Sequence, residues 1–88
     1  MNPNDDDALG ALEMRMRAIV AENIRAARAR RALSQDEMAE LAGVHRNYLG
    51  SIEREQRNIS IESLCKLALA LGCEPFELLQ TDFTPRRQ

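Results

Sequence analysis

The stretch Ser34–Glu53, SQDEMAELAGVHRNYLGSIE, carries the strongest fold signals in the chain. Ser34 is a favoured residue at a helix N-terminus, and Glu37 stands three positions later, where its carboxylate can complete a capping box. Gly43 follows a run of good helix formers, and glycine is the residue that most readily ends a helix in the left-handed conformation. These capping residues predict a short helix over Gln35–Ala42.

A second helix must begin soon after Gly43, and the spacing of apolar residues places it over Arg46–Glu53. Leu49 and Ile52 would face the core, and Ala39 is small enough for the second helix to cross the first one closely. The positions expected to face outward are Arg46, Asn47, Gly50 and Ser51. Two short helices joined by a tight glycine turn are typical of a helix-turn-helix unit, whose second helix enters the DNA major groove.

Three further helices are predicted outside this unit: one from about Glu13 or Arg17 to Ala32, one over Ile61–Leu71 and one over Pro75–Leu79. Ser60 and Gly72 flank the Ile61–Leu71 helix as cap residues. The apolar residues expected to face inward are Ile19, Val20, Ile24 and Ala27 in the helix that ends at Ala32, and Ile61, Leu64, Cys65, Ala68 and Leu71 in the Ile61–Leu71 helix. No segment alternates like a strand, so we expect an all-α fold, a compact bundle of five helices.

The chain has 88 residues, which is enough for a single domain. We expect the DNA-binding domain to span residues 15–80 and a polar tail to follow over residues 81–88. Residues 1–14 form an acidic N-terminal arm, which is either disordered or part of a longer first helix. We therefore expect no second catalytic or sensor domain.

The net charge of −2 argues weakly against a nucleic-acid partner, but the charges are unevenly distributed. Residues 1–14 contain four acidic residues and no basic one. Residues 15–57 contain nine arginines against six acidic residues. Arginine is the side chain whose planar fork suits phosphates and guanine edges, so the middle of the chain is the region expected to contact DNA.

Several classes of protein are excluded by missing signals. No apolar run reaches the roughly 18 residues of a membrane span, and the N-terminus lacks the pattern of a secretory signal, so we expect a cytoplasmic protein without membrane contact. Cys65 and Cys73 stand too far apart for a zinc motif, and we expect both to be small buried hydrophobes. No catalytic constellation is visible, and we expect no enzyme activity, no metal and no cofactor.

Residues 24–79, from IRAARARRALSQDEM to GCEPFELL, resemble the Cro/C1-type (Xre-family) helix-turn-helix proteins. Within them, VHRNYLGSIEREQRNISIESL is similar to the controller proteins of restriction-modification systems, which are short and bind DNA as homodimers. The resemblance implies a five-helix fold of the lambda-repressor-like type. It also implies an ion pair between Arg28 and Glu53, which we interpret as structural, although Arg28 in a basic stripe would also suit a phosphate contact.

The same resemblance assigns DNA contacts by position. Gln35 would donate its amide to a phosphate, unless it is only an ordinary helix former. Arg46 suits guanine and Asn47 suits adenine, because each side chain can bond two atoms of that base, and Ser51 accepts either partner. These three residues are the expected base-reading positions.

Two residues, one within the Arg46–Glu53 helix and one just before it, can be interpreted in two ways. Tyr48 lies at the DNA in the controller proteins, but partial burial against the first helix is the other reading of this amphipathic side chain. His45 stands where the family usually has a Ser or Thr cap. It would either donate to a phosphate or base, or begin the helix less well.

The loop after the second helix is polar, and its side chains would lie along the DNA backbone or simply be solvated. These residues are Arg54, Gln56, Arg57 and Asn58. Many family members have glycine where this chain has Glu55. A non-glycine residue there either costs about 1 kcal/mol to adopt the left-handed conformation or ends the helix differently.

The C-terminal region carries more large apolar residues than a short segment can bury by itself: Phe76, Leu78, Leu79 and Phe83. We expect them to form a homodimer contact, and the alternative is that they only cap the core. A two-fold dimer would engage two half-sites about 34 Å apart on a double-stranded palindromic operator.

The sequence therefore predicts a homodimeric DNA-binding regulator of transcription, with RNA polymerase as a further candidate partner. A restriction-modification controller and a phage or plasmid repressor are both compatible with it. A protein-interaction module, such as an antitoxin or anti-repressor, is the alternative suggested by the acidic N-terminal arm.

Overall fold

The computed structural model describes residues 3–83 and 85. The described chain contains four α-helices and one 3-10 helix: α1 (Pro3–Arg30), α2 (Gln35–Ala42), α3 (Arg46–Glu53), α4 (Ile61–Leu71) and η1 (Pro75–Leu79). It contains no strand in these residues, so the all-α prediction is confirmed. The fifth helix is a 3-10 helix rather than an α-helix, because five residues after Pro75 allow little more than one tight turn.

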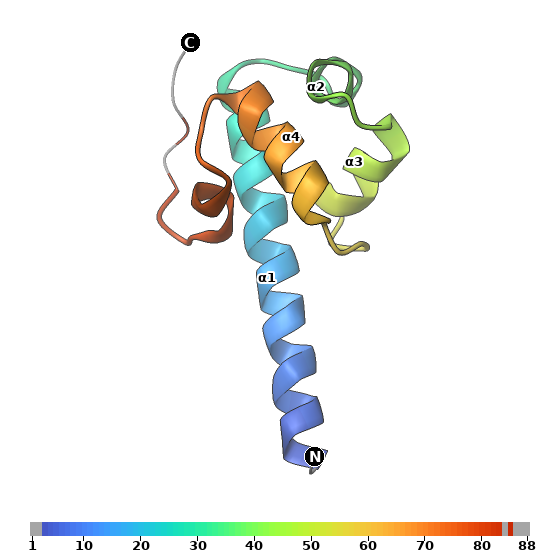
Figure 1. The fold of residues 1–88 in the computed structure, drawn as a ribbon, viewed down its shortest axis with the longest axis vertical. Helices are drawn as coiled ribbons and strands as arrows, with labels where there is room; N and C mark the ends of the chain where they lie inside the picture. Colours follow the sequence, from blue (N-terminus) through green and yellow to red (C-terminus); the bar gives the residue numbers. More distant parts are fainter. Residues whose placement is uncertain (1–2, 84, 86–88) are drawn as a thin grey trace.

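Figure 1 shows α1 running the length of the molecule, with the other helices gathered around its C-terminal half. The N-terminal half of α1 projects away from them, which gives the molecule extents of 46 × 26 × 19 Å. The predicted start at Glu13 or Arg17 was wrong, and the alternative of a longer first helix is the one that the structure has from Pro3 onward. Ala8, Leu9, Ala11 and Leu12 are good helix formers, Pro3 stands at the favoured first helical position, and the acidic residues Asp5, Asp6 and Asp7 near the start favour a helix N-terminus.

The two helices of the helix-turn-helix unit begin and end where the sequence predicts. Ser34 Oγ accepts a hydrogen bond from the Glu37 backbone N–H at 3.0 Å, and the Glu37 carboxylate accepts from the Ser34 N–H at 2.8 Å. These bonds lower the pKa of Glu37 below its ordinary value. Gly43 adopts a left-handed φ of 73° and turns the chain into α3.

The core lies where α2, α3, α4 and η1 meet the C-terminal half of α1. Ile24, Met38, Leu49, Ile52, Leu67 and Leu78 are its large, fully buried side chains. Two predictions for α4 were wrong: Ile61 is 75% exposed, and Leu67, which was not predicted to face inward, is fully buried. Ile61 is the first residue of α4 and precedes the turns that pack on the core.

Two polar side chains that the sequence did not single out tie the end of the chain to α1. Asn23 is buried, and its amide donates to the backbone oxygens of Leu78 and Gln80, both at 2.9 Å. Arg31 donates to the backbone oxygens of Ala70 and Leu71, both at 2.7 Å, at the C-terminus of α4. These carbonyls would otherwise lack helical partners.

Arg28 and Glu53 form a bidentate ion pair between α1 and α3. Arg28 Nε donates to Glu53 Oε2 at 3.0 Å, and Nη2 donates to Oε1 at 2.9 Å. The Glu53 side chain is only 3% exposed, so its charge is satisfied by protein groups instead of water. The hydrogen bond to Glu53 raises the pKa of Arg28 above its ordinary value.

The chain leaves α3 through a left-handed residue, Glu55, with φ of 63°. The Glu55 N–H donates to Ile52 O at 3.0 Å, and the Gln56 N–H donates to Ser51 O at 2.9 Å. This pair of bonds is the Schellman motif, which usually has glycine at the left-handed position. Of the two alternatives for Glu55, the structure therefore has the left-handed one.

Arg28→Met is expected to lower the free energy of unfolding by about 3–5 kcal/mol, because it leaves the buried Glu53 carboxylate without its cation. Urea denaturation followed by circular dichroism measures the loss. Arg30→Met, an exposed residue of the same helix, is the control and should change stability by about 0.5 kcal/mol or less. A loss below about 1 kcal/mol for Arg28→Met contradicts a structural role for the pair.

Glu55→Gly is expected to raise the free energy of unfolding by about 0.5–1 kcal/mol, since glycine adopts the left-handed conformation without steric cost. Glu55→Ala is the matched control: it removes the carboxylate but keeps Cβ, and should give no gain. Equal stabilisation by both variants would show that the charge matters and the backbone does not. The urea midpoint at unchanged slope is the measurement.

Candidate nucleic-acid interface

α2 and α3 lie side by side at one edge of the bundle and are joined by the turn at Gly43 (Figure 1). Leu49 and Ile52 anchor α3 in the core, as predicted, and Ala39 is buried where the two helices cross. Arg46 and Asn47 are exposed at the N-terminal end of α3. The first turn of α3 is therefore accessible and could enter a DNA major groove, which is wide enough to admit an α-helix.

Arg46 is held by an ion pair within the helix-turn-helix unit. Its Nε lies 2.8 Å from Asp36 Oδ1 at the start of α2, and the two side chains are 58% and 73% exposed. An exposed pair of this kind contributes about 0.2–1 kcal/mol. Arg46 can therefore exchange Asp36 for a better partner at little cost.

Gln35 lies in the Arg28–Glu53 network. Its Nε2 donates to Glu53 Oε1 at 3.0 Å, so the amide helps to satisfy the buried carboxylate. Gly50 was expected to face outward, but it is buried, because the ends of the Gln35 and Arg54 side chains lie over it. The absence of a side chain at Gly50 leaves the space that these two residues occupy.

His45 caps α3, which the sequence reading did not anticipate. Its Nδ1 accepts a hydrogen bond from the Asn47 backbone N–H at 3.0 Å. A ring nitrogen can take the place of a Ser or Thr oxygen, so the expectation that His45 starts the helix poorly was wrong. The side chain is exposed, and its other ring nitrogen remains available to a ligand.

Tyr48 is half-buried against the core and also contacts the loop that precedes α4. Its hydroxyl accepts a hydrogen bond from the Ser60 N–H at 3.2 Å, and the Arg57 guanidinium lies 5.5 Å from the ring centroid. Burial raises the pKa of Tyr48, but hydrogen bonding with Ser63 and Ser60 and the charge of Arg57 outweigh it, so the net pKa is lowered. Tyr48 thus positions Arg57 beside α3.

The remaining predicted residues surround the C-terminal end of α3. Ser51 donates to Tyr48 O at 2.7 Å, so its hydroxyl is already engaged in the helix. Arg54 Nε donates to the Gln56 side-chain oxygen at 3.1 Å, and both residues are exposed. Asn58 accepts from Arg17 Nη1 at 2.8 Å, which ties this loop to α1.

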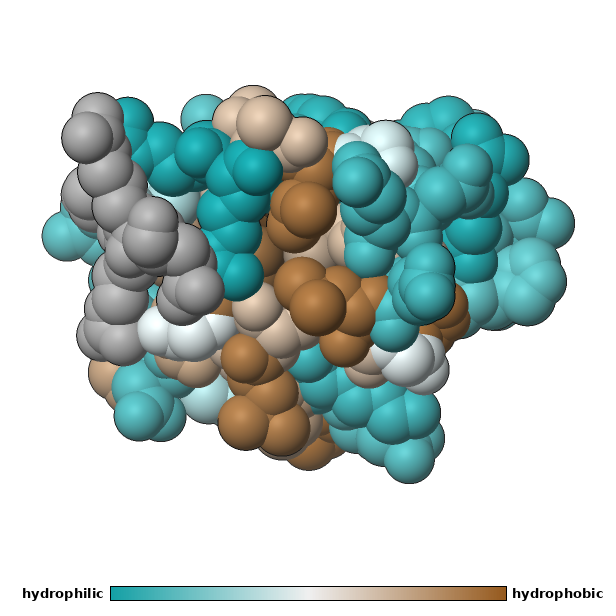
Figure 2. All heavy atoms as spheres, turned by 90° about the horizontal axis from the view of Figure 1, so that it is seen from above, coloured by the Kyte–Doolittle hydropathy of each residue, from teal (hydrophilic) through white to brown (hydrophobic). Residues whose placement is uncertain are grey.

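The structure therefore brings three arginines, Arg46, Arg54 and Arg57, to exposed positions on α3 and its following loop. Seen along α1 from its C-terminal end, the surface over the α2–α3 side is mostly hydrophilic, and apolar residues gather between it and the C-terminal segment (Figure 2). The polar side suits a charged ligand.

The four apolar residues predicted for a dimer contact differ in their exposure. Phe76 is 62% exposed and Leu79 is 37% exposed, whereas Phe83 is half-buried against the core. Leu78 is fully buried and receives the Asn23 bond at its backbone, so its assignment to a surface was wrong. A short 3-10 helix turns one residue in each turn inward, and Leu78 is that residue.

Other kinds of site find no support in the described residues. Within them, no helix is long and apolar enough to cross a membrane. No group of three or more His, Cys, Asp or Glu side chains among the described residues could hold a metal ion. Cys65 and Cys73 form no disulfide and are only half-buried, so they are less enclosed than the sequence predicts.

Comparison with known proteins agrees with this geometry. The sequence profile of the family HTH_3, described as helix-turn-helix, matches residues 24–78. The chain is 44% identical over 66 residues to the control protein C.SmaI of Serratia marcescens, covering 75% of this chain and 79% of that protein.

Two solved structures are also similar. The hypothetical transcription factor NHTF from Neisseria superposes with a TM-score of 0.72 at 37% identity, over 77% of this chain and 78% of that one. The restriction-modification controller protein C.AhdI from Aeromonas hydrophila superposes with a TM-score of 0.68 at 42% identity, over 70% of this chain and 94% of that one. This chain belongs to the helix-turn-helix family of the Cro/C1 (Xre) type.

Proposed function

We propose that this protein is a sequence-specific DNA-binding regulator of transcription that acts as a homodimer. The observation that carries the proposal is the exposed N-terminal turn of α3, where Arg46 and Asn47 stand on a helix anchored by Leu49 and Ile52. A rigid helix of this width fits the major groove of B-form DNA. A protein that regulates by binding needs no catalytic site.

Base reading is assigned to the first turn of α3. Arg46 can donate two hydrogen bonds to O6 and N7 of a guanine, and Asn47 can bond N6 and N7 of an adenine. The Asp36 partner of Arg46 is exposed and is lost at little cost when a base replaces it. Ser51 contributes less, because its hydroxyl is bonded to the Tyr48 carbonyl.

Phosphate contacts are assigned to residues on both sides of the reading turn. Arg54 and Arg57 extend the positive charge along the backbone, and the exposed ring nitrogen of His45 adds a donor. Gln35 can reach a phosphate only by releasing Glu53, so we assign its main role to the ion-pair network. The exposed carboxylate of Glu55 beside these groups keeps nonspecific affinity modest.

Similarity to two controller proteins, at 44% and 42% identity, supports a role as restriction-modification controller. The homodimer is assigned to the exposed C-terminal apolar residues Phe76 and Leu79. One helix-turn-helix unit reads few base pairs, and two units related by a two-fold axis would read a palindrome with half-sites about 34 Å apart.

Arg46→Ala is expected to weaken binding to the preferred duplex by about 1–3 kcal/mol and to relax the preference at one base pair of each half-site. Selection from a randomised duplex pool identifies the site, and titrations on matched and mismatched duplexes measure the change. Lys66→Ala, which removes a positive charge from α4, is the control and should retain the preference. A wild-type chain that prefers no duplex would refute the proposed function.

Arg57→Ala gives a contrasting result in the same titrations. It should weaken all duplexes about equally and lower the slope of log affinity against log salt by about 1, since it removes one phosphate contact. If Arg57→Ala changed the sequence preference and Arg46→Ala did not, the assignment of the two arginines would be reversed.

Phe76→Glu is expected to convert the dimer into a species of half the mass and to abolish tight binding to a duplex with two half-sites. Sedimentation equilibrium measures the mass. Leu41→Glu, a similarly exposed apolar residue on α2, serves as control and should leave the mass unchanged. A Phe76→Glu chain of wild-type mass would place the dimer contact elsewhere.

A further inference from the structure

The apolar stripe of α1 continues beyond the core onto the projecting half of the helix. Leu9, Leu12, Met16 and Val20 follow one another at intervals of three and four residues, which places them on one face. Val20 is 4% exposed within the core, whereas Leu9 and Leu12 are each about half exposed, at 52% and 51%. The outer part of a continuous apolar face is therefore uncovered.

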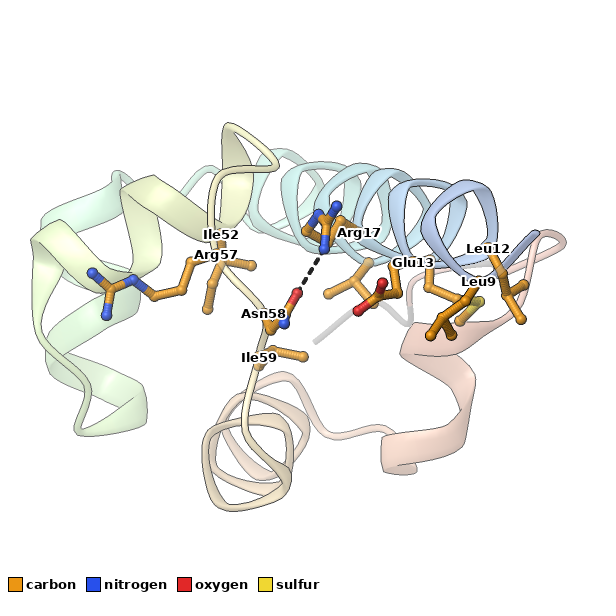
Figure 3. A pocket seen from close by; sticks show the side chains of 10 residues that line it. Leu9, Leu12, Glu13, Arg17, Ile52, Arg57, Asn58 and Ile59 are labelled. Atoms are coloured by element: carbon orange, nitrogen blue, oxygen red, sulfur yellow. Dashed lines mark hydrogen bonds between the residues drawn. The ribbon is translucent and has the colours of Figure 1, made fainter. Parts of the chain in front are cut away.

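This face forms one wall of a groove. The α3–α4 loop supplies the opposite wall with Asn58 and Ile59, and Ile52 of α3 also lines the groove (Figure 3). The groove has a volume of about 330 Å³. Arg17 reaches across to Asn58 at 2.8 Å, while the guanidinium of Arg57 points away from the groove. The groove is thus mainly apolar and open along the helix.

The spacing of the stripe is that of a helix-pairing seam. Leu9, Leu12 and Met16 are separated by three and then four residues, as at the core positions of paired helices. Figure 1 shows this half of α1 standing clear of α2, α3 and α4. An occupant that is itself a helix would cover the full length of the stripe.

The charges of α1 favour one orientation of such a helix. Two antiparallel copies centred near Leu12 share residues 3–21 of α1. Residues 3–14 of this part carry four acidic residues and no basic one, and residues 15–21 carry Arg15 and Arg17 and no acidic residue. A parallel copy would bring like charges together along its whole length, whereas an antiparallel copy brings the acidic half beside the arginines. With the two-fold axis close to Leu12, Asp6 of one copy lies within about one residue of the level of Arg17 of the other, and both residues flank the same side of the stripe.

We infer that the N-terminal half of α1 is a self-association surface, on which a second copy of this chain packs its own α1 in the antiparallel direction. Leu9 of each copy faces Met16 of the other, and Leu12 faces its equivalent. The contact is isologous, so each stripe is covered by the same stripe of the partner. This surface is separate from the C-terminal residues proposed for the dimer and does not rest on DNA binding.

The first test compares masses by sedimentation equilibrium over a concentration series. The double variant L9E/L12E should have half the mass of the wild type at high concentration, because glutamate on the seam repels its counterpart. M14E is the matched control: Met14 is 65% exposed on the opposite side of α1, and the variant should keep the wild-type mass. Glutamate favours helices, and circular dichroism checks that α1 remains formed.

The second test determines orientation by disulfide cross-linking, in chains whose native cysteines are replaced by Ala. In an antiparallel pair, L9C cross-links with M16C when the two chains are mixed, and neither variant cross-links with itself. In a parallel pair each variant cross-links with itself and the mixture gives no additional product. Positions 9 and 16 are about 10.5 Å apart along one helix, beyond the reach of a disulfide, so the two outcomes are distinct.

Equal mass for wild type and L9E/L12E at every concentration would overturn the inference, as would self-linking of L9C and of M16C. If the stripe binds a different protein and not a second copy, the purified wild type and L9E/L12E will have the same mass. The result is independent of the proposed function: L9E/L12E can lose association and still bind DNA, while Phe76→Glu tests the other surface. Wild-type association should also weaken as salt rises, because charge complementarity contributes to it.

Discussion

The buried carboxylate of Glu53 is the constraint on which the arrangement of the helices depends. A charge enclosed to this degree is tolerated only when protein groups replace water, and here they come from two other helices. Arg28 of α1 supplies two hydrogen bonds, and Gln35 of α2 supplies a third. Arg25 of α1 also donates to the Glu53 backbone oxygen. The end of α3 is therefore held to α1 and α2 together.

This anchoring separates the structural residues of the helix-turn-helix unit from its exposed ones. Gln35 and Gly50 lie on the inner side, close to Glu53, whereas Arg46 and Asn47 lie on the outer side at the other end of α3. Tyr48 marks the boundary, since its ring supports Arg57 and its hydroxyl accepts from Ser60. A short helix can present exposed side chains in defined positions only when its other face is fixed in this way.

The three-dimensional placement of charge explains how a chain with a net charge of −2 can suit DNA. Four of the 14 acidic residues lie in the projecting half of α1, where no basic residue precedes Arg15, and Arg46, Arg54 and Arg57 lie on or shortly after α3. The sum of charges averages over two surfaces that serve different partners. In this molecule one surface suits DNA, and the other is the self-association surface inferred on α1.

The local signals of the sequence determined α2, α3 and α4, because Ser34, Gly43, Ser60 and Gly72 act on backbone groups a few residues away. The burial of Leu49 and Ile52 followed from helical period, and the Arg28–Glu53 pair from family resemblance. Tertiary packing decided the rest: the burial of Gly50 and Leu78, the exposure of Ile61, and the bonds of Asn23 and Arg31. These depend on which elements meet in space, and no short-range rule contains that information. The projecting half of α1 combines both kinds of information. Its helical conformation depends on residues within the helix, but the groove beside it is formed only because the α3–α4 loop packs next to α1 in the folded chain.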